Sequence, residues 1–133
     1  MADINCAALV YIEDDRLLLV KVRELEKYYL PGGKIEVDEE PIDAAIRETY
    51  EELNVVLDKS LVRYLGRVEG PAYPQDAVVS LECFTYDGKL SDVSKNNEIT
   101  EVRYFDLRHH EQIAPAVLVL IEQLNTGELS YAK

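Results

Sequence analysis

Three glutamates at helical spacing are the residues of this sequence best placed to do chemistry. Glu48, Glu51 and Glu52 lie close together, so a helix would hold them on one arc of its surface. Like charges at these spacings destabilise a helix by about 0.2–0.5 kcal/mol per pair, and anions near its C-terminus are disfavoured too. A divalent cation would remove both penalties. The cluster therefore indicates a cation site, with a solvated acidic face as the alternative.

Magnesium is the cation that such oxygen ligands suit best. It accepts one or two carboxylates, keeps several waters and usually binds together with substrate phosphates. The ion polarises a phosphoryl oxygen and can position or acidify a water for in-line attack. The acids thus predict phosphate chemistry.

The helix that would carry the acids is well delimited. Pro41 suits a first helical position, and Asn54 suits the left-handed residue just past a helix end. Between them, residues recur at i, i+3, i+4, i+7 and i+11 and form one core-facing stripe. These residues are Ile42, Ala45, Ile46, Thr49 and Leu53. We expect a helix over residues 41–53 with the acids beside this stripe.

Strand-like runs surround this helix. They cover residues 4–12, 16–22, 28–30, 55–57, 61–68, 77–86 and 101–105, and a final helix follows Pro115 and ends near Gly127. The segments 13–15, 31–33, 69–76 and 87–88 are predicted as turns or loops. This order predicts an α+β fold in which a mixed β-sheet is sandwiched between helices (α/β/α). A length of 133 residues fits one domain over residues 1–133.

Composition and charge limit the partners. The net charge is −12, from 26 acidic and 14 basic residues, so binding to a nucleic-acid polymer or an anionic membrane is disfavoured. Apolar stretches are too short to cross a bilayer, and the N-terminus shows no secretion signal. Cys6 and Cys83 are expected to be buried, reduced thiols, as in a cytoplasmic protein. A small phosphorylated ligand stays compatible, because a bound cation reverses the charge locally.

A longer pattern contains the acidic helix. Gly33, five residues, Glu39, seven residues and then Arg-Glu-Thr-Tyr-Glu-Glu-Leu-Asn-Val over residues 47–55 resemble the Nudix box. In that box a glycine, a glutamate, an Arg-Glu pair and a Glu-Glu pair recur at these spacings. Residues 30–36 resemble the usual lead-in, and strand order and final helix extend the resemblance over nearly the whole chain. The resemblance implies a Nudix fold.

Two residues depart from the box. Thr49 stands where an aliphatic residue is usual, and Asn54 stands where a glycine is usual. The Thr49 hydroxyl can bond back to the carbonyl of Ala45, and Asn54 can serve as the left-handed cap. Neither change touches a ligand.

The resemblance implies a set of metal ligands. Glu51 and Glu52 would be the main ligands of Mg²⁺, for which Mn²⁺ could substitute. Glu48 would be a third ligand or a base acting on water. The backbone carbonyl of Gly32 would add a ligand from the preceding loop, where glycines indicate unusual backbone angles or close approach of another group.

Other box residues would hold this site together. Arg47 would orient Glu48, and Glu39 would anchor the loop to the helix through Arg47; an ordinary surface ion pair is the alternative. Gly33 would be structural. Lys34 could contact a phosphate or be solvated.

A further acid is expected from a later loop, because members of the family often recruit one as a ligand or general base. Glu98 is the preferred candidate because it follows a loop, whereas Glu101 opens a strand; a plain surface acid is the alternative. His109 and His110 lack a partner motif and are expected to be exposed loop residues rather than metal ligands.

The loops would choose the substrate. Tyr73 could stack on a base or ribose, and by strand alternation either Tyr28 or Tyr29 should face the cleft, with Tyr29 preferred; packing is the alternative for each. The resemblance implies a pyrophosphohydrolase acting on a nucleoside diphosphate-linked substrate, such as a (deoxy)nucleoside triphosphate, a nucleotide sugar or a dinucleoside polyphosphate. A nucleotide sensor that does not cleave is the alternative, but a sensor is expected to have lost box acids. A homodimer is compatible with the family, although no patch identifies an interface.

Overall fold

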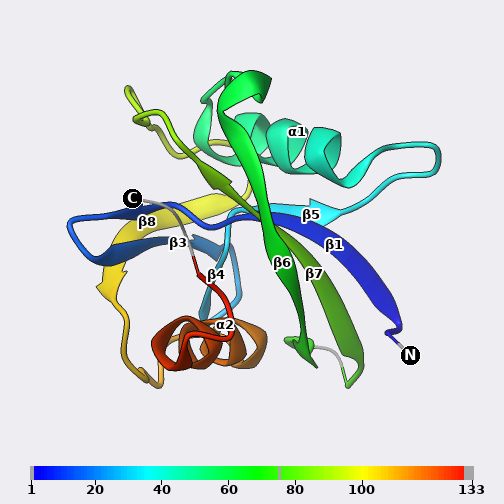
Figure 1. Cartoon of the computed structure of the whole chain (residues 1–133), viewed down its shortest axis with the longest axis vertical. Coiled ribbons are helices and arrows are strands. Elements are labelled where there is room, and N and C mark those ends of the chain that lie inside the picture. Colours follow the sequence, from blue (N-terminus) through cyan, green and yellow to red (C-terminus); the bar gives the residue numbers. More distant parts are fainter. Residues whose placement is uncertain (1, 75, 131–133) are drawn as a thin grey trace.

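Two helices lie on opposite sides of the strands in the computed structural model, which describes residues 2–74 and 76–130 (Figure 1). Helix α1 spans Pro41–Leu53 and helix α2 spans Pro115–Thr126. A short 3-10 helix, η1, spans Lys59–Leu61. The predicted α+β sandwich is confirmed, although the strands form two sheets. Within the described residues, neither helix is long and apolar enough to span a membrane.

The first sheet is mixed and has the order β5-β1-β7-β6. Its strands are β5 (Gly32–Lys34), β1 (Ile4–Leu9), β7 (Val78–Tyr86) and β6 (Val62–Pro71). β1 pairs in parallel with β7, whereas β5 and β6 each pair antiparallel with their neighbour. β1 thus lies between the glycine strand β5 and the long β6–β7 hairpin.

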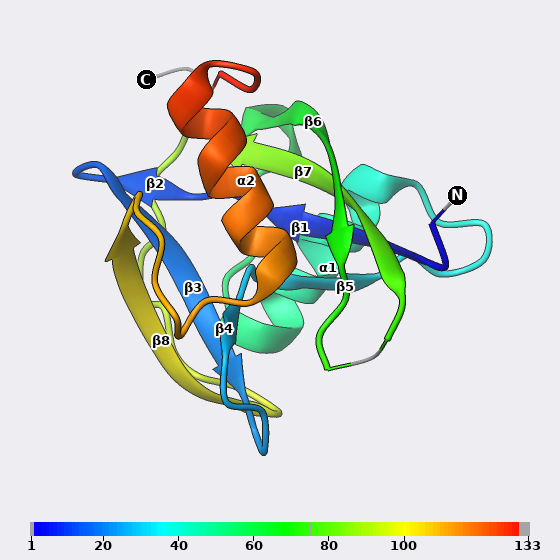
Figure 2. The same cartoon turned by 90° about the horizontal axis from the view of Figure 1, so that it is seen from below.

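The second sheet is antiparallel and centres on β3 (Arg16–Val22). β3 pairs with β2 (Ile12–Glu13), β4 (Tyr28–Tyr29) and β8 (Ile99–Asp106). Asp14 and Asp15, both at positive φ, form the turn between β2 and β3 and lie within the turn predicted over residues 13–15. Figure 2 shows α2 in front of the strands of both sheets.

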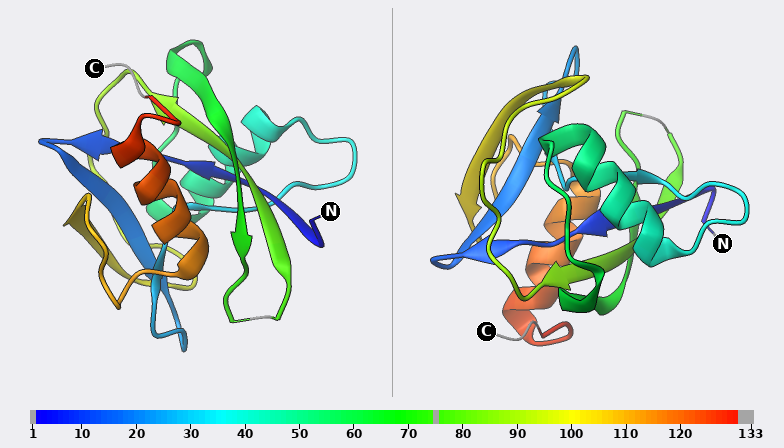
Figure 3. Two further views of the ribbon diagram at one scale, coloured as in Figure 1. Left: turned by 60° about the horizontal axis from the view of Figure 1, so that its bottom comes forward. Right: turned by 90° about the horizontal axis from the view of Figure 1, so that it is seen from above.

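β1 and β3 pack on both faces. Ala8 and Leu19 belong to the cluster that includes the α2 residues Val117 and Leu120. Ala7 and Leu18, each one residue earlier, belong to the cluster under α1, because successive strand residues point to opposite faces. Burying each such leucine stabilises the fold by about 1.5–3 kcal/mol. The two helices therefore pack on opposite faces of these strands, which form a common layer between them. Figure 3 shows this arrangement from below and from above.

Helix α1 has the predicted ends. Pro41 occupies the first turn, and Asn54 adopts the left-handed conformation, with φ at 59°. The Asn54 N–H donates to the carbonyl of Tyr50. Thr49 is buried, and its hydroxyl donates to the Ala45 carbonyl at 2.8 Å, as expected for this departure from the box.

Three local predictions are wrong. Gly32 and Gly33 do not form a turn but pair with β1 in strand β5. Residues 55–57 alternate between buried and exposed like a strand, yet they pair with none of the described strands. β6 continues through Pro71, because β6 is an edge strand and proline is tolerated there.

Candidate active site

Strand β5 brings the glycine segment against the acids at the end of α1. The Gly32 N–H donates to Oε1 of Glu52 at 3.1 Å. A Cβ added to Gly33 would lie 2.5 Å from the carboxyl carbon of Glu48. The predicted close approach of another group at these glycines is therefore found, although in a strand rather than a turn.

Arg47 lies at the centre of an ion-pair network. Its Nε and Nη2 donate to the two carboxylate oxygens of Glu39, at 2.8 and 2.9 Å. Its Nη1 donates to Glu48 at 2.9 Å and to Glu51 at 3.3 Å, and Nη2 also donates to the Lys34 carbonyl at 3.1 Å. These hydrogen bonds hold the pKa of Glu39 at about 2 and raise the pKa of Arg47. Arg47 thus touches both expected partners, Glu39 and Glu48.

The acids of α1 are crowded. Burial is the largest cause that raises the pKa of Glu52 to about 8; the Gly32 N–H opposes it, and the charges of Glu48, Glu51 and Glu98 add to it. Burial likewise raises the pKa of Glu48 against the opposing effect of Arg47. A cation placed among these carboxylates would offset both the burial and the repulsion.

The donor set suits a hard divalent cation, although the carboxylates face other partners. Among residues 2–74 and 76–130, no three His, Cys, Asp or Glu side chains form a preformed ligand group. Glu48 is turned to Arg47, and Glu52 to the Gly32 N–H. Carboxylates and a neighbouring backbone segment are nevertheless the oxygen ligands that Mg²⁺ takes, with waters completing its shell.

Glu98 and Glu101 have different surroundings. Glu98 is exposed in the turn before β8, and its charge contributes to the raised pKa of Glu52. Glu101 accepts a hydrogen bond from the Tyr28 hydroxyl at 2.5 Å and pairs with Lys21 at 3.6 Å. The charge of Glu98 therefore acts on the acids of α1. Glu101 instead contacts Tyr28 and Lys21 on the second sheet.

The two histidines lie apart from the acids. His110 Nε2 lies 2.6 Å from Oδ1 of Asp106, and its ring packs edge-on against Phe105. His109 is exposed beside α2. The expectation of exposed loop residues holds for His109, whereas His110 is partly buried because it packs on Phe105 and pairs with Asp106.

A pocket of about 190 Å³ adjoins the acids. Among its lining residues are the expected Gly32, Gly33, Lys34, Glu52, Tyr29 and Tyr73. Tyr29, whose pKa burial raises to about 12, faces this pocket. Tyr28 instead is buried against Phe105, so strand alternation selects Tyr29 as the cleft residue.

The rest of the pocket wall comes from residues that the sequence did not single out for it. They are Ile4, Cys6, Val20, Val22, Leu25, Lys27, Leu30, Ala72 and Val79. Both cysteines are free thiols; Cys83 is buried as expected, whereas Cys6 is only half-buried, at the pocket wall. The Tyr73 hydroxyl accepts a hydrogen bond from the Glu26 N–H at 3.3 Å, so two loops meet beside the pocket. No local pattern marks these residues, because distant segments contribute them.

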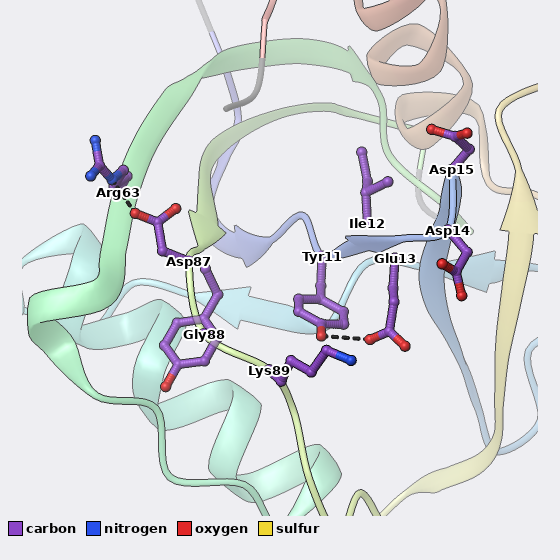
Figure 4. Close-up of a pocket in the computed structure, with 10 residues that line it drawn as sticks. Tyr11, Ile12, Glu13, Asp14, Asp15, Arg63, Asp87, Gly88 and Lys89 are labelled. Atoms are coloured by element: carbon purple, nitrogen blue, oxygen red, sulfur yellow. Dashed lines mark hydrogen bonds and ion pairs between the residues drawn. The ribbon is translucent and has the colours of Figure 1, made fainter. Parts of the chain in front are cut away.

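A separate pocket lies at the β2–β3 turn (Figure 4). Two pairs of its lining residues contact each other: the Tyr11 hydroxyl donates to Glu13 at 2.7 Å, and Arg63 pairs with Asp87. None of the residues of the Nudix-like pattern lines it. The pocket beside Glu52 is therefore the candidate active site.

Comparison with known families agrees with this arrangement. The NUDIX domain model matches residues 3–124. The chain belongs to the Nudix family. Diphosphoinositol polyphosphate phosphohydrolase 3-alpha of Mus musculus is 46% identical over 57 residues, which are 43% of this chain and 34% of that protein. Diphosphoinositol polyphosphate phosphohydrolase 2 of Homo sapiens is also 46% identical over 57 residues, 31% of its length. The match thus spans about a third of the length of these relatives.

Solved structures share the Nudix fold at low identity. The MutT protein from Methanosarcina mazei Go1 superposes with a TM-score of 0.75 at 20% identity, covering 94% of each chain. The MutT Nudix hydrolase from Burkholderia pseudomallei gives a TM-score of 0.71 at 23% identity, covering 91% of this chain and 97% of that one. At these identities the likeness establishes the fold, as predicted from the Nudix box.

Proposed function

We propose that this protein is a metal-dependent Nudix pyrophosphohydrolase that cleaves a diphosphate bond in a small nucleotide. One observation carries the proposal: a single pocket is lined by Glu52 and the glycine strand together with Tyr29 and Tyr73. Carboxylates beside glycines suit a metal-bound diphosphate, and aromatic rings suit a nucleobase. The family assignment supports this class of enzyme.

The metal would be Mg²⁺, with Mn²⁺ as a substitute. Glu51, Glu52 and the carbonyl of Gly32 would hold it, with Glu48 as a third ligand or as the base that accepts a proton from water. When bound, the ion would polarise a phosphoryl oxygen and favour attack by water.

The chain's own residues would orient the acids and the substrate. Arg47 keeps the carboxylate of Glu48 in one direction through its 2.9 Å hydrogen bond. Lys34, beside Glu52 in the pocket lining, would contact a phosphate oxygen. Glu98 would act as a further ligand or as a general base.

Diphosphoinositol polyphosphate is a second candidate substrate, because the curated relatives carry that name. The pocket favours a nucleotide over it. Lys27 and Lys34 are the basic side chains of the lining, and the Lys27 ammonium already donates to the carbonyl of Glu111 at 2.7 Å. Several phosphates around a ring call for more positive charge than this, in a chain of net charge −12.

The test is phosphate and pyrophosphate release from a substrate panel, with Mg²⁺, with Mn²⁺ and with chelator. The panel contains nucleoside triphosphates, nucleotide sugars, dinucleoside polyphosphates and a diphosphoinositol polyphosphate. We expect metal-dependent release from one nucleotide class. Binding of nucleotides without release would favour the sensor, and release only from the inositol compound would transfer the assignment to the second candidate.

The remaining proposals concern location and assembly. Free thiols at Cys6 and Cys83 agree with a cytoplasmic location, which cell fractionation would test. A homodimer, tested by light scattering, stays compatible with this scheme.

A further inference from the structure

All four carbonyls at the end of α1 have hydrogen-bond partners. The last four carbonyls of a helix have none within the helix itself. Here the donors to Tyr50, Glu51, Glu52 and Leu53 are respectively the Asn54 N–H at 2.9 Å, the Asn97 side-chain amide at 2.6 Å, the Asn96 N–H at 3.1 Å and the Ser94 N–H at 3.0 Å. Three of the four donors come from one distant segment, residues 94–97, which we name the cap segment.

The cap segment leads directly into Glu98. Asn97 adopts the left-handed conformation, with φ at 53°, which asparagine tolerates better than most residues. The turn is closed by the Ile99 N–H, which donates to the Asn96 carbonyl at 3.1 Å, and the Glu98 carbonyl accepts from the Arg23 N–H at 2.7 Å. The backbone on both sides of Glu98 is therefore fixed, to α1 before it and to the β3–β4 loop after it.

The chemistry of the cap suits the acids that it adjoins. The last turn of α1 contains no basic residue, although a lysine or arginine there would favour the helix dipole. Such a cation would also pair with Glu51 and Glu52 and would compete with a metal for them. The neutral Asn97 amide and the backbone N–H groups of Asn96 and Ser94 satisfy these carbonyls without bringing this charge.

We propose that Asn97 is a positioning residue for the active site. Its side-chain amide fastens the loop that carries Glu98 to the helix end that carries Glu51 and Glu52. The three acids thereby keep one relative arrangement for the metal and the substrate phosphate. This inference rests on the proposed function of these acids, and it goes beyond it because Asn97 itself touches neither metal nor substrate.

The test compares three variants of the full chain with the wild type. Asn97→Gly keeps the left-handed backbone and removes the amide. Asn97→Asp keeps the shape and replaces the donor with an acceptor. Asp92→Gly is the matched control, because Asp92 is exposed, lies at positive φ in the same β7–β8 connection and is outside the cap segment. Melting temperature is measured for each, so that loss of fold is seen separately.

Two readouts decide the outcome. We expect both Asn97 variants to lower kcat by about 10- to 100-fold with a small change in KM, and to weaken Mn²⁺ binding, followed by electron paramagnetic resonance, by a similar factor. Asp92→Gly should match the wild type. Wild-type kcat and wild-type Mn²⁺ affinity in Asn97→Gly would overturn the proposal.

Failure of the proposed function would look different. If the wild type binds Mn²⁺ but turns over no substrate, the proposed hydrolase function is wrong. The Mn²⁺ affinities of the variants then still decide the role of Asn97. If the wild type does not bind Mn²⁺ at all, the acids are no metal site, and the positioning role is overturned with it.

Discussion

Arg47 binds Glu39 through two parallel hydrogen bonds, Nε to Oε2 at 2.8 Å and Nη2 to Oε1 at 2.9 Å. This fork fixes the plane of the guanidinium, and so directs its remaining nitrogen, Nη1, toward Glu48 at 2.9 Å. A lysine could not replace this geometry, because an ammonium has no planar fork. The loop before α1 and the acid within α1 are thus held by one side chain.

The first prediction concerns acid stability. The hydrogen bonds from Arg47 and, to a smaller extent, from the Glu36 N–H lower the pKa of Glu39 from its usual 4.5 to about 2, so the folded state favours the ionised form. The contribution of ionised Glu39 to the stability of the fold is fully present above pH 4.5 and is lost as the pH falls toward 2. Glu39→Gln should lower the melting temperature at pH 7, and the difference from the wild type should shrink below pH 4.5.

Thermal unfolding between pH 2.5 and 8 checks this, with Glu40→Gln as the control. Glu40 precedes α1 and makes no side-chain cap hydrogen bond. A difference between Glu39→Gln and wild type that grows on acidification would contradict the assignment.

The second prediction concerns Glu52. Glu52→Gln should reduce turnover by roughly 100-fold or more, because an amide is a poor ligand for a hard cation. The fold should stay intact, since Gln can still accept the Gly32 N–H. Circular dichroism and kinetics measure the two effects, and Glu122→Gln on the exposed side of α2 is the control. Unchanged activity in Glu52→Gln would refute the proposed ligands.

The third prediction separates the two glycines of β5. A Cβ on Gly33 would meet the side-chain carboxyl group of Glu48 at 2.5 Å, whereas one on Gly32 would meet the backbone oxygen of Ala7 at 2.3 Å. Gly33→Ala should therefore lose activity with little loss of stability. Gly32→Ala should destabilise the fold by about 1–3 kcal/mol. Urea unfolding and kinetics on both variants test this, and equal effects on stability would count against it.

The fourth prediction concerns substrate choice. Tyr73→Leu removes a ring that would stack on the base, and base stacking is worth about 1–3 kcal/mol. We expect KM for the preferred nucleotide to rise roughly 10-fold while the Mg²⁺ requirement stays the same. Tyr73→Phe keeps the ring and loses only the bond from the Glu26 N–H, so it should resemble wild type. If Tyr73→Leu keeps the KM of every nucleotide, Tyr73 does not read the base.

Sequence patterns succeeded where the local residues decide the structure. Both ends of α1 follow from Pro41 and Asn54, whose preferences need no distant partner. The pairing of Arg47 with Glu39 followed from the resemblance to the box. Residues 55–57 show the limit of such patterns: Val55 and Leu57 are buried in alternation, but a strand also needs a neighbour that the sequence does not specify.

The parts that sequence could not predict depend on contacts between distant segments. Gly32 and Gly33 suggested a turn, since the pairing of β5 with β1 is visible only once the chain has folded. The wall of the pocket combines residues of β1, β3, β4, β5, β7 and α1 with residues of two loops. Asn97 did leave a signal, because asparagine favours left-handed turns, but its partner, the Glu51 carbonyl, lies 46 residues away in the chain.

The two-faced packing of β1 ties the acidic helix to the opposite side of the molecule. Ala7 contributes to the cluster under α1 and Ala8 to the cluster under α2. Because both clusters depend on β1, we expect neither to unfold while the other stays folded. The chain should lose its structure in one cooperative transition. A cavity made beneath α2, remote from every proposed ligand, would then lower activity by reducing the population of folded molecules, without altering the kinetics of those that remain.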